Sequence, residues 1–126
     1  MDERILMFFD RNMDALPLYE RFTERVFAGI GDVSVKVQKT QISFSVKYMF
    51  ACVSFARVRK KKDCPDSYIV VTFGLGSRVE SPRIDVATEP YPNRWTHHVM
   101  VSELEDIDDA LIGCIRVAAV LAAWKR

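Results

Sequence analysis

The chain has 126 residues, of which 49% are hydrophobic and 28% are charged, a composition that excludes a disordered chain. Its length suits one domain, 1–126, whose core can fold without disulfide or metal staples. The 18 Lys and Arg residues nearly cancel the 17 Asp and Glu residues. This balance argues against a dedicated nucleic-acid binder, which usually carries a clear basic excess.

The cysteines and the apolar segments indicate a cytoplasmic protein. The three cysteines include no CxxC pair, which disfavours a disulfide framework and a zinc site, and we expect neither a metal nor a cofactor. Cys52 and Cys114 stand among apolar residues, as buried thiols do, whereas Cys64 lies in a polar loop. Residues 1–9 do not form a secretory signal, and the longest apolar run, 117–124, is far shorter than the roughly 20 residues that span a bilayer. The sequence leaves monomer and homodimer open.

Two helices are predicted at the N-terminal end. Asp2 is positioned to cap a short helix that runs to about Phe9. A longer helix is expected to begin near Asp14, a good capping residue, with Pro17 in its first turn, where proline is tolerated. Its expected buried stripe is Leu18, Tyr19, Phe22, Val26 and Phe27.

Alternating apolar and polar residues predict strands through the middle of the chain. The apolar positions are odd-numbered from Val33 to Val37 and even-numbered from Ile42 to Val46. One straight strand cannot change phase in this way, so a turn or bulge is expected at 38–41. Further strands are predicted at 49–58, 68–75 and 95–101, with a short edge strand at 84–87.

The C-terminal helix has the clearest signals. Ser102 and Glu105 have the spacing of a capping box, acids gather at the start of the helix, and Lys125 and Arg126 close its end. Together these elements predict an α+β fold, in which a mainly antiparallel sheet of about five strands carries N-terminal and C-terminal helices in two layers. The expected buried stripe of the last helix is Ile107, Leu111, Cys114, Ile115, Ala118, Leu121 and Ala122.

The pair His97-His98 is the first candidate for chemistry. Neighbours on a strand point to opposite faces, so the two rings cannot hold one metal ion. His97 shares its face with Trp95 and Val99, which favours a core histidine bonded to the backbone. His98 shares its face with Arg94, and these two side chains could hold a carboxylate or a phosphate.

A second polar stretch, Lys39-Thr40-Gln41, falls at the predicted turn, where polar residues are commonly just solvated. The alternative hypothesis brings Lys39 and Gln41 to the same end of the sheet as Arg94 and His98. There the four side chains would form a small polar pocket for an anionic ligand. Secondary candidates for this pocket are Thr40, His97 and Arg78.

The segment 57–62 carries five positive charges in six positions, at Arg57, Arg59, Lys60, Lys61 and Lys62. A solvated loop is the simple interpretation, because such runs repel one another and stay hydrated. Contact with nucleic-acid phosphates is the alternative, although the run contains no aromatic residue on which bases could stack.

The sequence contains no GxGxxG, GxxxxGK[ST], HExxH or GxSxG motif. A thiol–imidazole pair between Cys52 or Cys64 and His97 has no third residue to orient it, so no catalytic residue is assigned. Three functions stay open. A non-catalytic binding module leads, ahead of a nucleic-acid accessory domain and an enzyme of unrecognised type.

Several of these stretches resemble the bacterial "domain of unknown function 5655" family. The resemblance rests on 16–19, 38–44, 50–51 and 94–98 and on the acid-capped helix that begins at Ile107, and it covers about 16–125. It implies a small α/β domain with Lys-Thr-Gln and Arg-Trp-Thr-His-His as its signature stretches. In that family the domain occurs alone or attached to modules labelled transport-related or nuclease-like, and no reaction follows from it.

Overall fold

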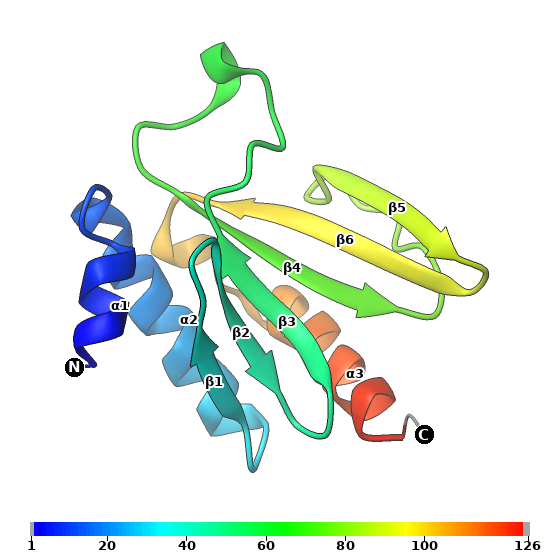
Figure 1. The fold of residues 1–126 in the computed structure, drawn as a ribbon. Coiled ribbons are helices and arrows are strands. Elements are labelled where there is room, and N and C mark those ends of the chain that lie inside the picture. Colours follow the sequence, from blue (N-terminus) through cyan, green and yellow to red (C-terminus); the bar gives the residue numbers. More distant parts are fainter. Residues whose placement is uncertain (1, 125–126) are drawn as a thin grey trace.

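The computed structural model describes residues 2–124, which form an antiparallel sheet with helices on one of its faces (Figure 1). The strands are β1 (Ser34–Val37), β2 (Gln41–Ser45), β3 (Met49–Ser54), β4 (Ile69–Leu75), β5 (Val86–Tyr91) and β6 (Arg94–Val101). The helices are α1 (Glu3–Phe8), α2 (Leu16–Gly29) and α3 (Asp109–Trp124), with 3-10 turns η1 (Met13–Ala15), η2 (Lys61–Asp63) and η3 (Leu104–Asp106). The predicted α+β fold is confirmed, and within residues 2–124 the sheet has six strands instead of about five.

The strand order is β1-β2-β3-β4-β6-β5, which makes the connection after β4 a crossover. β4 and β5 both run antiparallel to β6, so the chain has to return along β6 before β5 can begin. We call residues 76–85, which make this return, the crossover segment. It passes on the helix side of the sheet, where the Val79 backbone N–H donates to the ring of the buried His97.

The first helix has the predicted cap. The carboxylate of Asp2 accepts the backbone N–H of Arg4 at 2.8 Å. Phe9, which follows the helix, is fully buried, and its ring meets that of Phe55 edge-on with centroids 5.4 Å apart. This aromatic contact ties α1 to the end of β3.

The α2 helix carries the predicted stripe with one exception. It begins at Leu16 rather than near Asp14, and no side-chain cap starts it, because a 3-10 turn leads directly into it. Leu18 and Phe22 are buried as predicted, whereas Phe27 is 49% exposed. At about 100° per residue, Phe27 lies half a turn around the helix from Leu18 and therefore faces outward.

The β1 and β2 strands form a hairpin at the predicted change of phase. Val37 pairs with Ile42, and the Gln38 N–H donates to the Gln41 carbonyl at 2.8 Å. The turn between them brings the odd-numbered and the even-numbered apolar residues to the same face of the sheet.

Three predicted strand boundaries are wrong. β3 ends at Ser54 rather than at residue 58, because Phe55 leaves the sheet to stack on Phe8, with ring centroids 5.3 Å apart. The edge strand begins at Val86 rather than at residue 84, because the crossover segment reaches as far as Asp85. It also runs on to Tyr91 instead of ending at residue 87.

The capping box lies one residue later than predicted. Glu103 and Asp106 form it at the start of η3, and α3 begins only at Asp109. Asp108 then caps α3, since its carboxylate accepts the Leu111 N–H at 3.0 Å. The predicted stripe is buried except for Cys114, which is partly buried, and Leu121, which is 43% exposed.

The core lies between the sheet and the helices. Phe44 of β2 receives the ring of Phe22 edge-on, with centroids 5.5 Å apart, and both side chains are fully buried. α3 packs mainly on β3 and β4. No helix in the described part of the chain is long and apolar enough to cross a membrane.

The two phenylalanines of α2 give a test of this packing. Phe22→Ala should lower the free energy of unfolding by about 3–5 kcal/mol, because it opens a cavity in a filled core. Phe27→Ala, on the same helix but half-exposed, should cost less than about 1 kcal/mol. Urea unfolding followed by circular dichroism measures both values. Equal losses in the two variants would contradict the assigned face of α2.

Candidate functional site: a cavity beside Arg94

A tight turn between β5 and β6 positions Arg94. Pro92 and Asn93 form this turn, and Asn93 has a φ of 63°. Proline followed by a residue with positive φ is typical of a type II turn, and Asn tolerates that conformation better than most residues. Arg94 thus begins β6, paired with Tyr91 across the turn.

The strands around Arg94 end at different levels. The β4–β6 ladder continues to the pair of Leu75 and Trp95, but the β3–β4 ladder ends at Ala51 and Phe73. The start of β3 stays paired with β2 instead, and the register between these two strands shifts after Phe44. The sheet is therefore open between β3 and β4 at this end.

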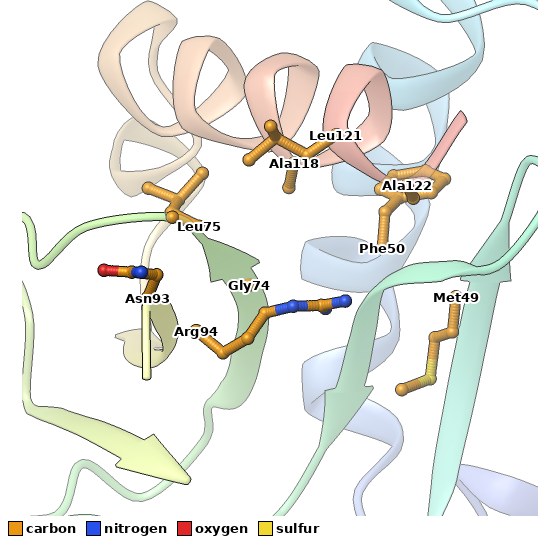
Figure 2. A pocket seen from close by; sticks show the side chains of 10 residues that line it. Met49, Phe50, Gly74, Leu75, Asn93, Arg94, Ala118, Leu121 and Ala122 are labelled. Carbon is orange, nitrogen blue, oxygen red and sulfur yellow. The ribbon is translucent and has the colours of Figure 1, made fainter. Parts of the chain in front are cut away.

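A cavity of about 210 Å³ lies at this opening, beneath α3 (Figure 2). Its wall on the helix side is apolar, and the small side chains of Ala118 and Ala122 leave room there. Gly74 of β4 and Gly76, the first residue of the crossover segment, border it without side chains of their own. The full lining is Met49, Phe50, Gly74, Leu75, Gly76, Asn93, Arg94, Ala118, Leu121 and Ala122.

Arg94 brings the one charged side chain of this lining. Figure 2 shows it extended from β6 toward Phe50 at the start of β3, while the Asn93 side chain points the other way. Arg94 is exposed, and among residues 2–124 no acid pairs with it. A guanidinium without a partner can donate two parallel hydrogen bonds to a carboxylate or a phosphate.

Lys39 and Gln41 lie at the opposite end of the sheet. Gln41 of β2 is in register with Ser54 of β3, which leads through Val70 of β4 to Met100 of β6. Met100 is six residues from Arg94, about 20 Å along a strand. The predicted meeting of the two segments is therefore wrong.

The strand order gives the physical reason. In a simple meander β2 and β6 would run in the same direction, and their first residues would share one edge. Because β6 lies directly beside β4, three antiparallel steps separate it from β2, and the two strands run in opposite directions. Lys39 instead borders a shallow hollow formed with Arg4, Met7 and Phe8 of α1, and the neighbouring Thr40 is exposed.

His98 forms a hydrogen bond away from the Arg94 cavity. It lies four residues further along β6, and its Nδ1 is 2.8 Å from the hydroxyl of Thr72 on β4. Burial lowers the pKa of His98 below its ordinary value of 6.5, so the ring is neutral at pH 7. The structure thus brings neither His98 nor Gln41 to Arg94.

His97 is a core residue, as its alternation with Trp95 and Val99 suggests. The ring is fully buried and stacks on Phe73, with centroids 5.1 Å apart. Its Nε2 accepts the Val79 N–H at 2.9 Å, which places the proton on Nδ1. The Nδ1 has no partner among the described residues.

The thiol–imidazole pair that the sequence analysis considered without assigning it does not form. Cys52 stands on the face that holds Thr72 and His98, opposite to the face of His97. Burial raises the pKa of the Cys52 thiol and keeps it protonated. Cys64 lies in the connection between β3 and β4, residues 55–68, which we call the basic loop, and its thiol donates to the Lys60 carbonyl at 3.4 Å.

Other predicted candidates lie outside the cavity. The Arg78 guanidinium is 5.8 Å from the ring centroid of Trp95 and also pairs with Glu80 at 3.5 Å. Residues 2–124 contain no group of three or more His, Cys, Asp or Glu side chains that could hold a metal ion.

The basic loop between β3 and β4 projects beyond the end of the sheet (Figure 1). Arg59 is tied back, since its Nε donates to the Asp85 carboxylate at 2.6 Å. The other four cations are exposed and have no ion-pair partner in the described part of the chain, and they are Arg57, Lys60, Lys61 and Lys62.

Sequence reasoning selected Arg94 but missed the cavity beside it. Two local signals were present, the small residues in Gly74-Leu75-Gly76 and the turn pair Pro92-Asn93. Neither signal reveals that α3 lies over both segments, because that contact joins residues far apart in the chain.

The fold and the site define a two-layer α+β domain with a small, partly apolar cavity at one end of its sheet. The family model described as "Domain of unknown function (DUF5655)" matches residues 7–119. The chain belongs to this family. The match begins and ends earlier than the expected 16–125. No curated protein and no solved structure matches the chain.

The buried His97 predicts a dependence of stability on pH. Burial is the main cause that lowers the pKa of His97 in the folded protein, while the unfolded chain keeps the ordinary value near 6.5. The unfolded state therefore binds more protons below that value, and the free energy of unfolding should fall as the pH drops from 6.5. His97→Gln keeps an acceptor for Val79 but does not titrate, so it should weaken this dependence. Urea midpoints between pH 5 and 8 test this, and an unchanged pH profile in the variant would contradict it.

Proposed function

We propose that this domain is a non-catalytic binding module that holds a small organic anion in the cavity beside Arg94. The observation that carries the proposal is an exposed guanidinium, without an ion-pair partner among residues 2–124, at the mouth of a cavity with apolar walls. Arg94 would bind a carboxylate or a phosphate, and an apolar group of the same ligand would enter the space between Leu75 and Phe50. The free thiols of this chain support a reducing, cytoplasmic location.

The exposure of Arg94 argues for an amphipathic ligand rather than a simple ion. A solvated ion pair contributes only about 0–1 kcal/mol, so an inorganic anion would bind weakly. Burial of apolar surface has to supply the rest, at about 25 cal/mol per Å².

The size of the cavity limits the ligand and its affinity. Typical ligand pockets measure about 300–1,000 Å³, and this cavity of about 210 Å³ suits a ligand of roughly ten non-hydrogen atoms. At about 0.4 kcal/mol per atom such a ligand gains about 4 kcal/mol, which corresponds to a Kd of about 1 mM. Benzoate has this size and combines a carboxylate with an apolar ring.

A second function is supported by the basic loop. Four exposed cations stand together on a segment that projects from the sheet, and phosphate backbones bind such clusters through release of counterions. We propose weak, sequence-independent contact with nucleic acid as the alternative role. The near-neutral charge of the whole chain makes it second to the anion site.

The anion proposal predicts a thermal shift that depends on one residue. Benzoate at 10 mM, about ten times the expected Kd, should stabilise the protein by about 1.4 kcal/mol, or about 4–6 °C in Tm. Arg94→Ala should remove the shift. Arg11→Ala, which removes an exposed arginine elsewhere, should keep it. If small aromatic and aliphatic carboxylates and phosphates give no shift, or the same shift in both variants, the anion site is refuted.

The alternative role predicts binding that weakens with salt. Replacing Lys60, Lys61 and Lys62 with Ala should reduce the slope of log K against log salt by about 2–3. The matched control replaces Arg11, Lys36 and Lys39, which removes the same charge from other surfaces. Fluorescence anisotropy with a labelled 20-base DNA measures the slopes. Equal losses in the two triple variants would exclude the loop as the contact.

A further inference from the structure

A second cavity, of about 170 Å³, lies where the crossover segment runs between β6 and α3. Phe73 and Val99 form its floor on the sheet, and Leu111 and Cys114 form its wall on α3. Its full lining is Phe73, Val79, Ser81, Arg83, Ile84, Val99, Ala110, Leu111 and Cys114. It shares no residue with the cavity beside Arg94.

The polar groups in this wall already have partners. The Arg83 guanidinium donates to both carboxylate oxygens of Asp108 at 2.8 Å and also to the Asp106 carbonyl. The Ser81 hydroxyl oxygen accepts the Arg83 backbone N–H at 3.2 Å. The cavity is half-open to solvent, and a water inside it finds few hydrogen-bond partners on the remaining apolar wall. The cavity thus favours an uncharged apolar occupant over water or an ion.

Hydrogen bonds hold the crossover segment in place over the cavity. Val79 is tied to His97 at 2.9 Å, and the Asp85 N–H donates to the His98 carbonyl at 2.9 Å. The Asp85 carboxylate accepts the Met100 N–H at 2.7 Å. Because the crossover segment is already held at both ends, it loses little conformational entropy when a ligand enters, which favours binding.

We propose that this cavity binds a small uncharged apolar molecule, an aromatic ring or a short branched hydrocarbon chain about the size of benzene. The volume supports this class, because an apolar cavity of about 150 Å³ engineered into another protein stays dry and binds benzene. Long acyl chains and ligands of three or more rings need the larger pockets of about 300–1,000 Å³. This site is separate from the anion site and does not depend on it.

The alkylation rate of the Cys114 thiol measures directly whether the cavity is occupied. It is partly buried and forms part of the cavity wall, so a bound molecule should shield its thiol. Cys64, in the basic loop, is the internal control, because it is partly exposed and lies outside the cavity. Alkylation by iodoacetamide, followed by mass spectrometry of the two cysteine peptides, gives both rates in one sample. With benzene or indole at ten times its Kd, Cys114 should react about tenfold more slowly and Cys64 at an unchanged rate.

A variant with a blocked cavity entrance tests the location of the ligand independently. Ala110 is exposed at the edge of the cavity, so Ala110→Leu should block the entrance while the fold is kept. Ala28→Leu, on the exposed side of α2, is the matched control. Benzene should raise the Tm of the unaltered protein, the Ala28→Leu variant and the Arg94→Ala variant equally, and it should leave Ala110→Leu unshifted.

Two results would overturn the proposal. One is the absence of both the Tm shift and the protection of Cys114 with benzene and with indole. The other is a shift that persists in Ala110→Leu, or that appears without protection of Cys114, since either places the ligand elsewhere. The benzoate shift should show the opposite dependence, lost in Arg94→Ala and kept in Ala110→Leu. Failure of one site therefore leaves the other testable.

Discussion

The ladder of seven residue pairs between β4 and β6 is the interaction on which the rest of the structure depends. It places β6 where a simple meander would place β5, so the chain has to run back over β6 before the edge strand can form. The crossover segment that results covers part of the helix side of the sheet beyond α3, which packs mainly on β3 and β4. Both cavities follow from this ladder. One lies where the β4–β6 ladder continues beyond the pairing of β4 with β3, and the other lies between the crossover segment and α3.

Much of the local structure could be predicted from the sequence, because its signals are local. The change of phase between Val37 and Ile42 predicts the hairpin, since a strand that kept one register would expose half of its apolar residues. The four-residue spacing of Leu18, Phe22 and Val26 predicts the buried face of α2. Errors occur where tertiary contacts override these signals. The capping box forms one residue later than predicted, and Arg83 of the crossover segment binds the carboxylate of Asp108 between that box and α3.

The candidate site could be predicted only in part. Arg94 and the other signature residues stand out as polar side chains on or beside strands, but the edge at which each strand begins depends on the strand order. Exchanging β5 and β6 reverses β6 relative to β2 and sends Arg94 to the edge opposite Gln41. No property of residues 39–41 or 94–98 encodes that exchange. It is decided by the fit of β6 beside β4, a pairing between segments about 25 residues apart.

Both cavities are bordered by α3, but by different residues of it. Cys114 and Ala118 are one turn apart on α3, yet the first borders the cavity whose arginine is ion-paired and the second borders the cavity with the exposed arginine. Arg83 is neutralised by Asp108, whereas Arg94 has no acid beside it within residues 2–124. The same residue type is thus part of the wall in one place and available to a ligand in the other. Because an arginine keeps its charge at every physiological pH, only its neighbours can make this difference. The absence of an ion-pair partner within residues 2–124 is therefore the feature that singles out Arg94 for the proposed binding role.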